Sequence, residues 1–284
     1  MKRSDGRRLD QLNPFTLIIP HMMVKRSEAI NYGKRVFPTE PIDRYLHEKR
    51  EQGHEDLTYL HVFIAGCVRV LAERPQLNRF IINRRFYQRI NISIAMAIKR
   101  SFRDDGEETT VKFEFDGSEN IFEIAETINK VIDEAVHDSG RTDQDELIKK
   151  LLAMPSFIPK LLISFIKGLD QINLLPASII KISPFHSSLF FTYLKSIKED
   201  YIYHHLYDLG TTGIFMALGA AKKIPVVIDD EVVARNVVEI GISNDERICD
   251  GLYLSRSLKL FEKYMNNPWL LDTSPDVKKS ETQD

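Results

Sequence analysis

Residues 245–251 read Asp245-Glu246-Arg247-Ile248-Cys249-Asp250-Gly251, and the interpretation of the chain starts from this stretch. Upstream lies Val232–Ile242, a run rich in β-branched residues that predicts a strand. Downstream, apolar residues spaced by four and three predict a helix over Leu252–Tyr264. The charged stretch therefore connects a strand to a helix, and such connections often carry functional side chains.

The flanking sequence predicts a mixture of helices and strands. Asp229-Asp230 separates Val226–Ile228 from the long strand, which is typical of a hairpin turn. Alternating or short apolar runs predict further strands over Ile92–Ile98, Thr110–Phe115, Leu189–Tyr193 and Gly213–Leu218, and helical spacing predicts helices over Ile42–Gln52, Leu57–Glu73 and Ile121–Val136. This mixture predicts a two-layer α/β fold with helices packed against one sheet.

The stretch at 245–251 resembles the His-x-x-x-Asp-Gly signature of chloramphenicol acetyltransferases and of the acyltransferase component of 2-oxoacid dehydrogenase complexes. Four of its residues match the form of the signature typical of the second group, and Glu246 stands where the histidine belongs. Further likenesses occur in the family's order, at Met23–Tyr32 (its opening helix), Asn91–Ile98, Ser188–Leu194 and Pro225–Arg235. The resemblance implies one CoA-dependent acyltransferase domain with a mixed sheet over residues 1–272.

The resemblance also implies roles for individual residues. In this superfamily the histidine is the general base, so Glu246 takes that place, and Thr192 matches the hydroxyl residue that stabilises the oxyanion. Asp250, next to Gly251, would pair with Arg26 and hold the loop. The family's sites form between subunits of trimers, so we expect a homotrimer that uses coenzyme A and no metal.

Each of these roles has an alternative. Glu246 is either a base whose pKa is raised by burial or a structural residue that has replaced the catalytic group. Thr192 is either an oxyanion donor or an ordinary strand threonine. His204 and His205 are further candidates for the base, although paired histidines among tyrosines are often packing residues. The second function to consider is therefore an inactive trimeric binding or scaffolding protein of the same fold.

Composition limits the other possibilities. The formal net charge of −2 gives no overall attraction to nucleic acid, and two isolated cysteines are typical of a reducing, cytoplasmic compartment. The polar segment 273–284 is expected to be a disordered tail. Leu147–Ile182 is apolar with scattered lysines, which predicts short helices over the core or, alternatively, a lip that meets an acyl chain or a membrane surface. Asn78–Arg89 holds four arginines, which either form a solvated face or contact CoA phosphates.

Overall fold

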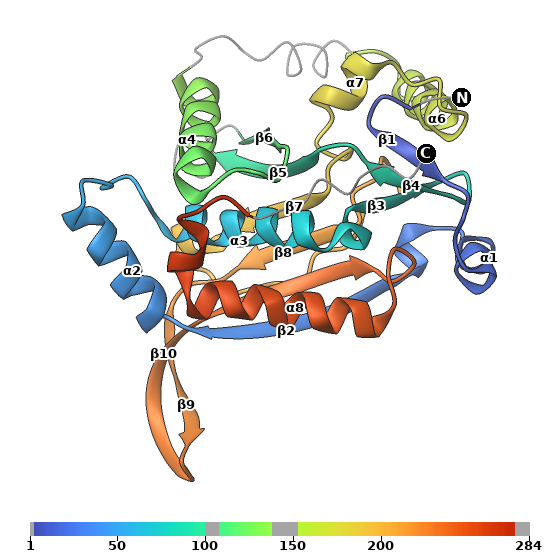
Figure 1. The fold of residues 1–284 in the computed structure, drawn as a ribbon. Coiled ribbons are helices and arrows are strands. Elements are labelled where there is room, and N and C mark those ends of the chain that lie inside the picture. Colours follow the sequence, from blue (N-terminus) through green and yellow to red (C-terminus); the bar gives the residue numbers. More distant parts are fainter. Residues whose placement is uncertain (1–2, 100–107, 138–152, 276–284) are drawn as a thin grey trace.

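The computed structural model describes residues 3–99, 108–137 and 153–275 (Figure 1). The helices are α1 (Pro14–Met22), α2 (Glu40–Glu51), α3 (Tyr59–Glu73), α4 (Ile121–His137), α6 (Phe157–Gln171), α7 (Ala177–Ile182) and α8 (Gly251–Asn266). The strands are β1 (Gly6–Leu9), β2 (Ile30–Pro38), β3 (Arg79–Ile82), β4 (Arg85–Arg89), β5 (Ile92–Lys99), β6 (Glu108–Phe115), β7 (Leu189–Tyr193), β8 (Ile214–Leu218), β9 (Lys222–Ile228) and β10 (Glu231–Asp245).

The main sheet has the strand order β2-β10-β8-β7-β5-β6, and β9 pairs with the first half of β10. Strand β7 runs parallel to both of its neighbours, β5 and β8, whereas the other pairs are antiparallel. The sheet is therefore mixed. A smaller sheet, β1-β4-β3, lies beside it.

Helices α2, α3, α4 and α8 form a layer on one face of the main sheet (Figure 1). Helix α3 lies at its centre, and every residue from Tyr59 to Leu71 is buried. Its side chains join those of the sheet and of α8 in one apolar cluster that includes Phe63, Phe191 and Phe261. The predicted two-layer α/β fold with a mixed sheet is confirmed.

The chain from 199 to 206 crosses the opposite face of the sheet, where two glycines allow close approach. A Cβ atom on Gly241 in β10 would lie 2.2 Å from the carbonyl oxygen of Ile202, and one on Gly219 would lie 2.5 Å from the backbone nitrogen of Tyr201. These distances are shorter than van der Waals contact. The crossing segment can lie flat on the sheet because both positions lack a side chain.

We expect Gly241→Ala to lower the free energy of unfolding by about 1–3 kcal/mol, because the added methyl group must displace the backbone of Ile202. Gly33→Ala is the matched control. Gly33 lies beside Ile242 in the neighbouring strand β2, where an added Cβ would meet no described atom within 4 Å. Urea denaturation of the two variants measures the difference, and equal losses would contradict the steric explanation.

The structure corrects one predicted element. Met23–Tyr32 was predicted to begin a helix, but α1 ends at Met22, and the segment holds a three-residue 3₁₀ turn (Arg26–Glu28) followed by β2. Strand β2 pairs with β10 over its whole length, from Pro38 opposite Val237 to Ile30 opposite Asp245. Long-range strand pairing therefore decides the conformation of a segment whose local pattern is weak.

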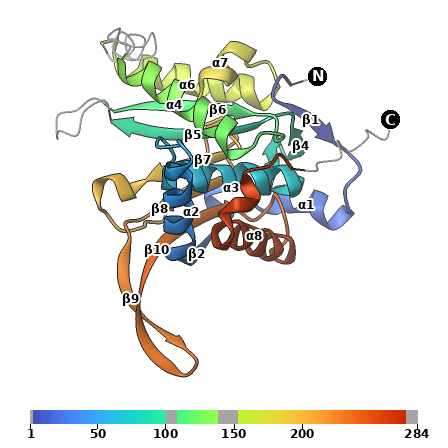
Figure 2. The same cartoon turned by 60° about the vertical axis from the view of Figure 1, so that its left-hand side comes forward.

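The predicted hairpin is confirmed and extends away from the body of the protein (Figures 1 and 2). Asp229 and Asp230 at its turn have φ values of 50° and 65°, as a type I′ turn requires. Val227 and Val232 pair across the hairpin, and both side chains are largely exposed. This projecting ribbon has exposed backbone hydrogen-bonding groups and apolar side chains, which are available for contact with a neighbouring molecule.

Candidate active site

Asp245 and Arg247 form a buried ion pair at the end of β10. The Nε and Nη2 atoms of Arg247 donate to the two carboxylate oxygens of Asp245 at 2.8 and 2.7 Å, which is the fork-to-fork geometry of strong arginine–carboxylate pairs. Arg247 Nη1 also donates to the carbonyl oxygens of Met23 and Val24. The pair therefore fastens the segment after α1 to the strand that leads into the 245–251 stretch.

Arg26 reaches the same aspartate. Its Nε lies 3.6 Å from Asp245 Oδ2, and its Nη2 donates to the carbonyl oxygen of Gly210 at 2.9 Å. Burial lowers the pKa of Arg26, and the neighbouring Arg247 lowers it further, whereas Asp245 raises it. One carboxylate and two guanidinium groups thus share a buried site, and they hold it in a fixed arrangement rather than add net stability.

The predicted pairing of Arg26 with Asp250 is wrong. Asp250 is exposed and caps helix α8, where its carboxylate accepts a hydrogen bond from the backbone nitrogen of Tyr253 at 2.8 Å. Gly251 is the first residue of α8, and a Cβ there would meet no described atom within 4 Å. The structural role expected of Asp250 belongs to Asp245, because that carboxylate is buried beside both arginines.

Glu246 lies just beyond the buried cluster and is partly exposed. Its backbone nitrogen donates to the carbonyl oxygen of Ala29, and its carboxylate oxygen Oε2 accepts a hydrogen bond of 2.7 Å from Asn31 Nδ2. Both partners precede or begin strand β2. The backbone of Glu246 is therefore held from both sides, by β2 and by the ion pair of its neighbours, and its carboxylate meets a neutral donor.

Thr192 lies far from Glu246 within one chain. Thr192 in β7 is opposite Ala217 in β8, and Ala217 is opposite Gly241 in β10. Glu246 comes five residues after Gly241, which corresponds to about 16 Å along the sheet at the usual rise per residue. Thr192 is partly exposed near the other end of these strands.

His204 and His205 lie on the crossing segment, on the sheet face opposite the helices. The ring of His204 stacks on Phe215 with a centroid distance of 4.0 Å, and burial and then His205 lower its pKa. His205 is exposed and contacts Tyr207 edge-on. The stacking gives His204 a packing role, and burial and the neighbouring His205 favour its neutral form.

A cavity of about 270 Å³ lies beside the buried cluster. Its wall includes Arg26 and Arg247 together with Lys25, Arg84 and the single acid Asp208. The Nε atom of Arg26 is buried without a hydrogen-bond partner among the described residues. The cavity therefore suits an anionic group. Arg84 is one of the Asn78–Arg89 arginines considered for CoA phosphates, whereas Lys25 was not singled out in the sequence, since only the fold brings the two loops together.

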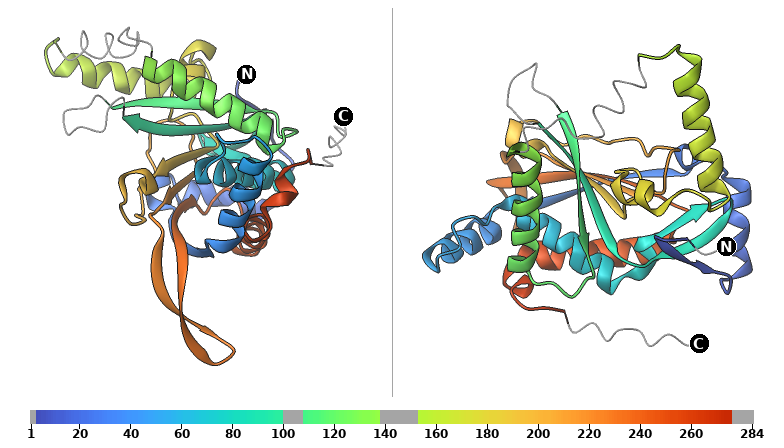
Figure 3. Two further views of the ribbon diagram at one scale, coloured as in Figure 1. Left: turned by 90° about the vertical axis from the view of Figure 1, so that its left-hand side faces the viewer. Right: turned by 90° about the horizontal axis from the view of Figure 1, so that it is seen from above.

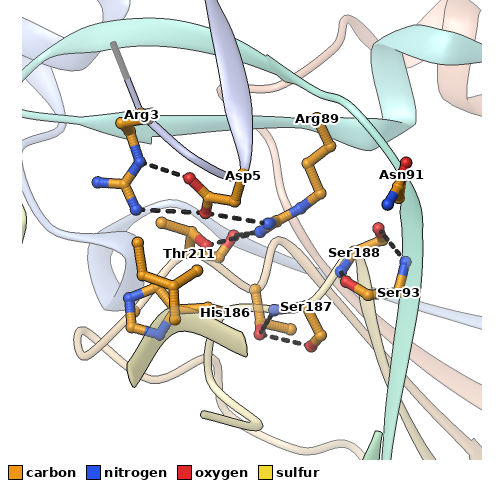
Figure 4. A network of polar contacts seen from close by, with 12 residues as sticks. Arg3, Asp5, Arg89, Asn91, Ser93, His186, Ser187, Ser188 and Thr211 are labelled. Atoms are coloured by element: carbon orange, nitrogen blue, oxygen red, sulfur yellow. Dashed lines mark hydrogen bonds and ion pairs between the residues drawn. The ribbon is translucent and has the colours of Figure 1, made fainter. Parts of the chain in front are cut away.

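A second polar network joins the N-terminal segment to the chain around α6 and α7 (Figure 4). Arg3 donates to Asp5 and to Asp170, and Arg89 donates to Thr211 and lies 3.6 Å from Asp5. A neighbouring cavity of about 290 Å³ is lined by Arg89, Lys112 and His186, among others. Arg89 is buried, so the solvated-face alternative for the Asn78–Arg89 arginines is wrong for this residue.

His186 is the histidine of this network. Its Nδ1 lies 2.8 Å from Ser183 Oγ and its Nε2 lies 3.3 Å from a carboxylate oxygen of Asp170. Burial lowers the pKa of His186, although Asp170 acts in the opposite direction. Burial also opposes ionisation of Asp170, but hydrogen bonds and charges from His186 and Arg3 outweigh it and lower that pKa. The network is therefore most favourable with a neutral histidine and an ionised carboxylate.

Acid should weaken the fold through this histidine. As pH falls through about 6.5, the unfolded chain protonates His186 more fully than the folded chain does, so the free energy of unfolding falls as pH decreases from about 7 to below 6.5. His186→Gln should make that slope shallower, even though it lowers stability at neutral pH. Urea denaturation at several pH values across this range measures the slope. His47→Gln, which replaces an exposed histidine, is the control. An unchanged slope in His186→Gln would contradict this account.

Among the described residues, no group of three His, Cys, Asp or Glu side chains is placed as metal ligands would be. A family model for the 2-oxoacid dehydrogenases acyltransferase (catalytic domain) matches residues 211–272, which include the 245–251 stretch. No curated protein matches the chain.

Solved structures match almost the whole chain. A probable dihydrolipoamide acetyltransferase from Listeria monocytogenes is 19% identical, with 92% of this chain and 94% of that chain covered and a TM-score of 0.58. A structure of the cubic core of the pyruvate dehydrogenase multienzyme complex is 10% identical, with 93% of each chain covered and a TM-score of 0.60. A chloramphenicol acetyltransferase is 12% identical, with 92% and 99% covered and a TM-score of 0.57.

The chain has the chloramphenicol acetyltransferase-like acyltransferase fold. The resemblance inferred from the sequence is confirmed, and so is the fold class. Within this acyltransferase fold, the 245–251 stretch lies in the matched segment, at the end of β10 and the start of α8. Glu246, which the sequence resemblance aligns with the expected histidine, lies between Asp245 and Arg247 of the ion pair.

Proposed function

We propose that this protein is a CoA-dependent acyltransferase in which Glu246 acts as the general base and the site is completed by a second copy of the chain. Glu246 would accept the proton of the attacking thiol or acceptor group, and Thr192 Oγ1 would donate a hydrogen bond to the oxyanion. The observation that most supports this proposal is the buried ion-pair cluster of Asp245, Arg247 and Arg26 next to Glu246, the proposed base.

The free energy needed to bury these charges indicates that the ion-pair cluster has a functional role. Two guanidinium groups and one carboxylate are desolvated there, and a buried cluster of this kind gives little net stability. Its effect is to fix the backbone on both sides of Glu246, as a site that must position a proton acceptor requires. A carboxylate ordinarily has a pKa of about 4.3, so a base at this position needs a neighbour that shields it from water.

A second copy would provide that neighbour. Thr192 and Glu246 are too far apart along one sheet to act on the same carbonyl group, so a site that uses both draws them from different copies. The exposed β9–β10 ribbon supplies a surface for such an assembly. The multienzyme core named among the similar structures is itself an assembly. We therefore propose a homotrimer.

Coenzyme A would be the acyl donor or acceptor. Its phosphate groups are suited to the cavity lined by Lys25, Arg26, Arg84 and Arg247, where the buried Arg26 Nε has no hydrogen-bond partner among the described residues. CoA supplies the thioester, and the residues of this chain bind its charge and hold the proton acceptor. Of the cavity residues, Arg84 is exposed and can be replaced without loss of core packing.

Calorimetric titration with acetyl-CoA and longer acyl-CoA, combined with an assay of thiol release, tests the proposal on the full chain. The full chain should bind acyl-CoA, and Arg84→Gln should raise the dissociation constant at least about tenfold, because one charged contact to phosphate is lost. This result would support the assignment of the cavity to CoA phosphates. Arg44→Gln is the control, since Arg44 is on α2, outside the residues that line the cavity.

Co-expression of two inactive variants tests the shared site. If Thr192→Val and Glu246→Gln act at sites formed between copies, mixed assemblies contain some intact sites and regain turnover. Assemblies of either variant alone contain none. If both variants are inactive and the mixture also has no turnover, the two residues do not act together across an interface.

The alternative is an inactive trimeric binding or scaffolding protein with this fold. The replacement of the histidine by Glu246, which is partly exposed and hydrogen-bonded to Asn31, is the observation that favours it. This alternative predicts a trimer in light scattering without binding of any acyl-CoA. The same titrations therefore distinguish the two functions.

A further inference from the structure

Helix α6 carries an apolar stripe that faces solvent. Phe157, Leu161 and Phe165 follow one another at intervals of four residues, so they lie on one side of the helix. Their exposed fractions are 60%, 63% and 62%. Asp170, on the other side of the helix near its end, is buried and bonded to Arg3 and His186. These contacts anchor the C-terminal end of the helix, and the stripe points away from them.

Helix α1 carries a second stripe. Phe15, Ile18 and Met22 are spaced by three and four residues and have exposed fractions of 73%, 48% and 73%. Pro20, on the other side of the helix, is buried. Both helices lie at the same end of the molecule in Figure 1 and in the view from above in Figure 3.

The chain just after α1 and the end of α6 border the same cavity. Val24, just after α1, and Gln171, at the end of α6, line the same cavity together with Arg84 from the tip of the β3–β4 hairpin. Gln171 also accepts a hydrogen bond of 2.8 Å from the backbone nitrogen of Asn83 at that tip. The helix ends and the hairpin therefore form one end of the protein, which we call the α1–α6 end.

The exposed charges at the α1–α6 end are mainly positive. Lys160 and Lys167 on α6 are exposed, and the single acidic residue of that helix, Asp170, is buried in ion pairs. Arg84 and Arg85 are exposed on the hairpin tip. This local excess contrasts with the net charge of −2 of the whole chain. Apolar stripes flanked by basic side chains are complementary to the boundary between anionic headgroups and acyl chains.

We propose that the α1–α6 end docks on an anionic lipid membrane surface, with the stripes of α1 and α6 inserted at the level of the headgroups and the flanking lysines and arginines paired with lipid phosphates. Within the described residues, no helix is long and apolar enough to cross a membrane. The stripe residues and the lysines of α6 lie outside the residues that line the proposed CoA cavity, although Arg84 borders both surfaces, and the inference needs no bound CoA.

Flotation of the purified full chain with vesicles tests the proposal. Vesicles of phosphatidylcholine and phosphatidylglycerol in equal parts should carry the protein upward, whereas phosphatidylcholine alone should carry less of it. Leu161→Gln/Phe165→Gln should reduce the partition coefficient at least about tenfold, since two inserted side chains are lost. Lys160→Gln/Lys167→Gln should reduce it about fivefold for each charge removed, on the anionic vesicles.

Val136→Gln/Ile197→Gln is the matched control, because it removes two exposed apolar side chains from elements elsewhere in the fold. It should float as the unmodified chain does. Light scattering of each variant identifies the competing explanation. If the stripe variant changes the oligomeric state and leaves flotation unchanged, the stripe is an interface between copies and the proposal is wrong. Failure of the unmodified chain to float with either vesicle also overturns it.

Discussion

Glu246→Gln should abolish most of the acyl transfer while leaving acyl-CoA binding intact. The substitution keeps the shape of the side chain and its hydrogen-bonding capacity toward Asn31, but an amide cannot accept the proton of the attacking group. A positioned general base typically contributes about 10²- to 10⁴-fold to the rate, and turnover should fall by that amount. Thiol release under saturating acyl-CoA measures it, and calorimetry on the same variant measures binding.

Two further variants make this result interpretable. Glu126→Gln removes an exposed carboxylate from α4, away from the 245–251 stretch, and should leave turnover unchanged. Glu246→His places an imidazole in the same frame, and its pKa of about 6.5 is better matched to a thiol than that of a carboxylate. Turnover equal to or above that of the unmodified chain is expected. Full turnover in Glu246→Gln would remove Glu246 from the mechanism and favour His204 as the base.

Arg247→Leu should destabilise the fold strongly. The leucine would leave the buried carboxylate of Asp245 with the 3.6 Å contact to Arg26, and the carbonyl oxygens of Met23 and Val24 would lose their donor. Breaking one side of a buried ion pair typically costs about 3–5 kcal/mol, which corresponds to a melting temperature lower by about 10 °C for a chain of this size. Calorimetric or circular-dichroism melting measures the change.

Arg235→Leu provides the comparison. Arg235 pairs with Glu40 at 3.2 Å, but both side chains are well exposed, so this loss should be below about 1 kcal/mol. The double variant Asp245→Asn/Arg247→Leu should be more stable than the sum of the single losses predicts, because it removes the unpaired charge. Additive losses would show that Asp245 and Arg247 do not act as a pair.

The sequence alone was enough to predict the elements whose pattern is local. Leu189–Tyr193 was predicted with the bounds of β7, and α3 and α4 were predicted within two residues at each end. Their apolar residues recur at the period of the element, and Pro75 and Asp116-Gly117 mark boundaries that the backbone must respect. The family resemblance rested on the spacing of residues 245–251, which is likewise visible in the sequence.

The partners of the charged residues were decided by the tertiary structure. The sequence could show that Asp245, Arg247 and Asp250 lie within six residues, but it could not show which carboxylate turns inward. Strand β10 continues to Asp245, so this side chain faces the buried arginines, whereas the start of α8 directs Asp250 to cap the helix in solvent. The change from strand to helix between Asp245 and Asp250 therefore gives one carboxylate a buried structural role and the other a helix-capping role.

Long-range pairing decided the rest. Strand β2 forms because it pairs with the edge of β10. Arg89 is buried because its partners Asp5 and Thr211, from distant parts of the chain, lie next to it in the fold. Asp170 of α6 is fixed inward by Arg3, a contact across most of the sequence, and the apolar stripe lies on the other side of the helix. Local periodicity determines helices and strands through neighbouring residues. The direction of each charged or apolar face depends on contacts between residues far apart in the chain, which only folding brings together.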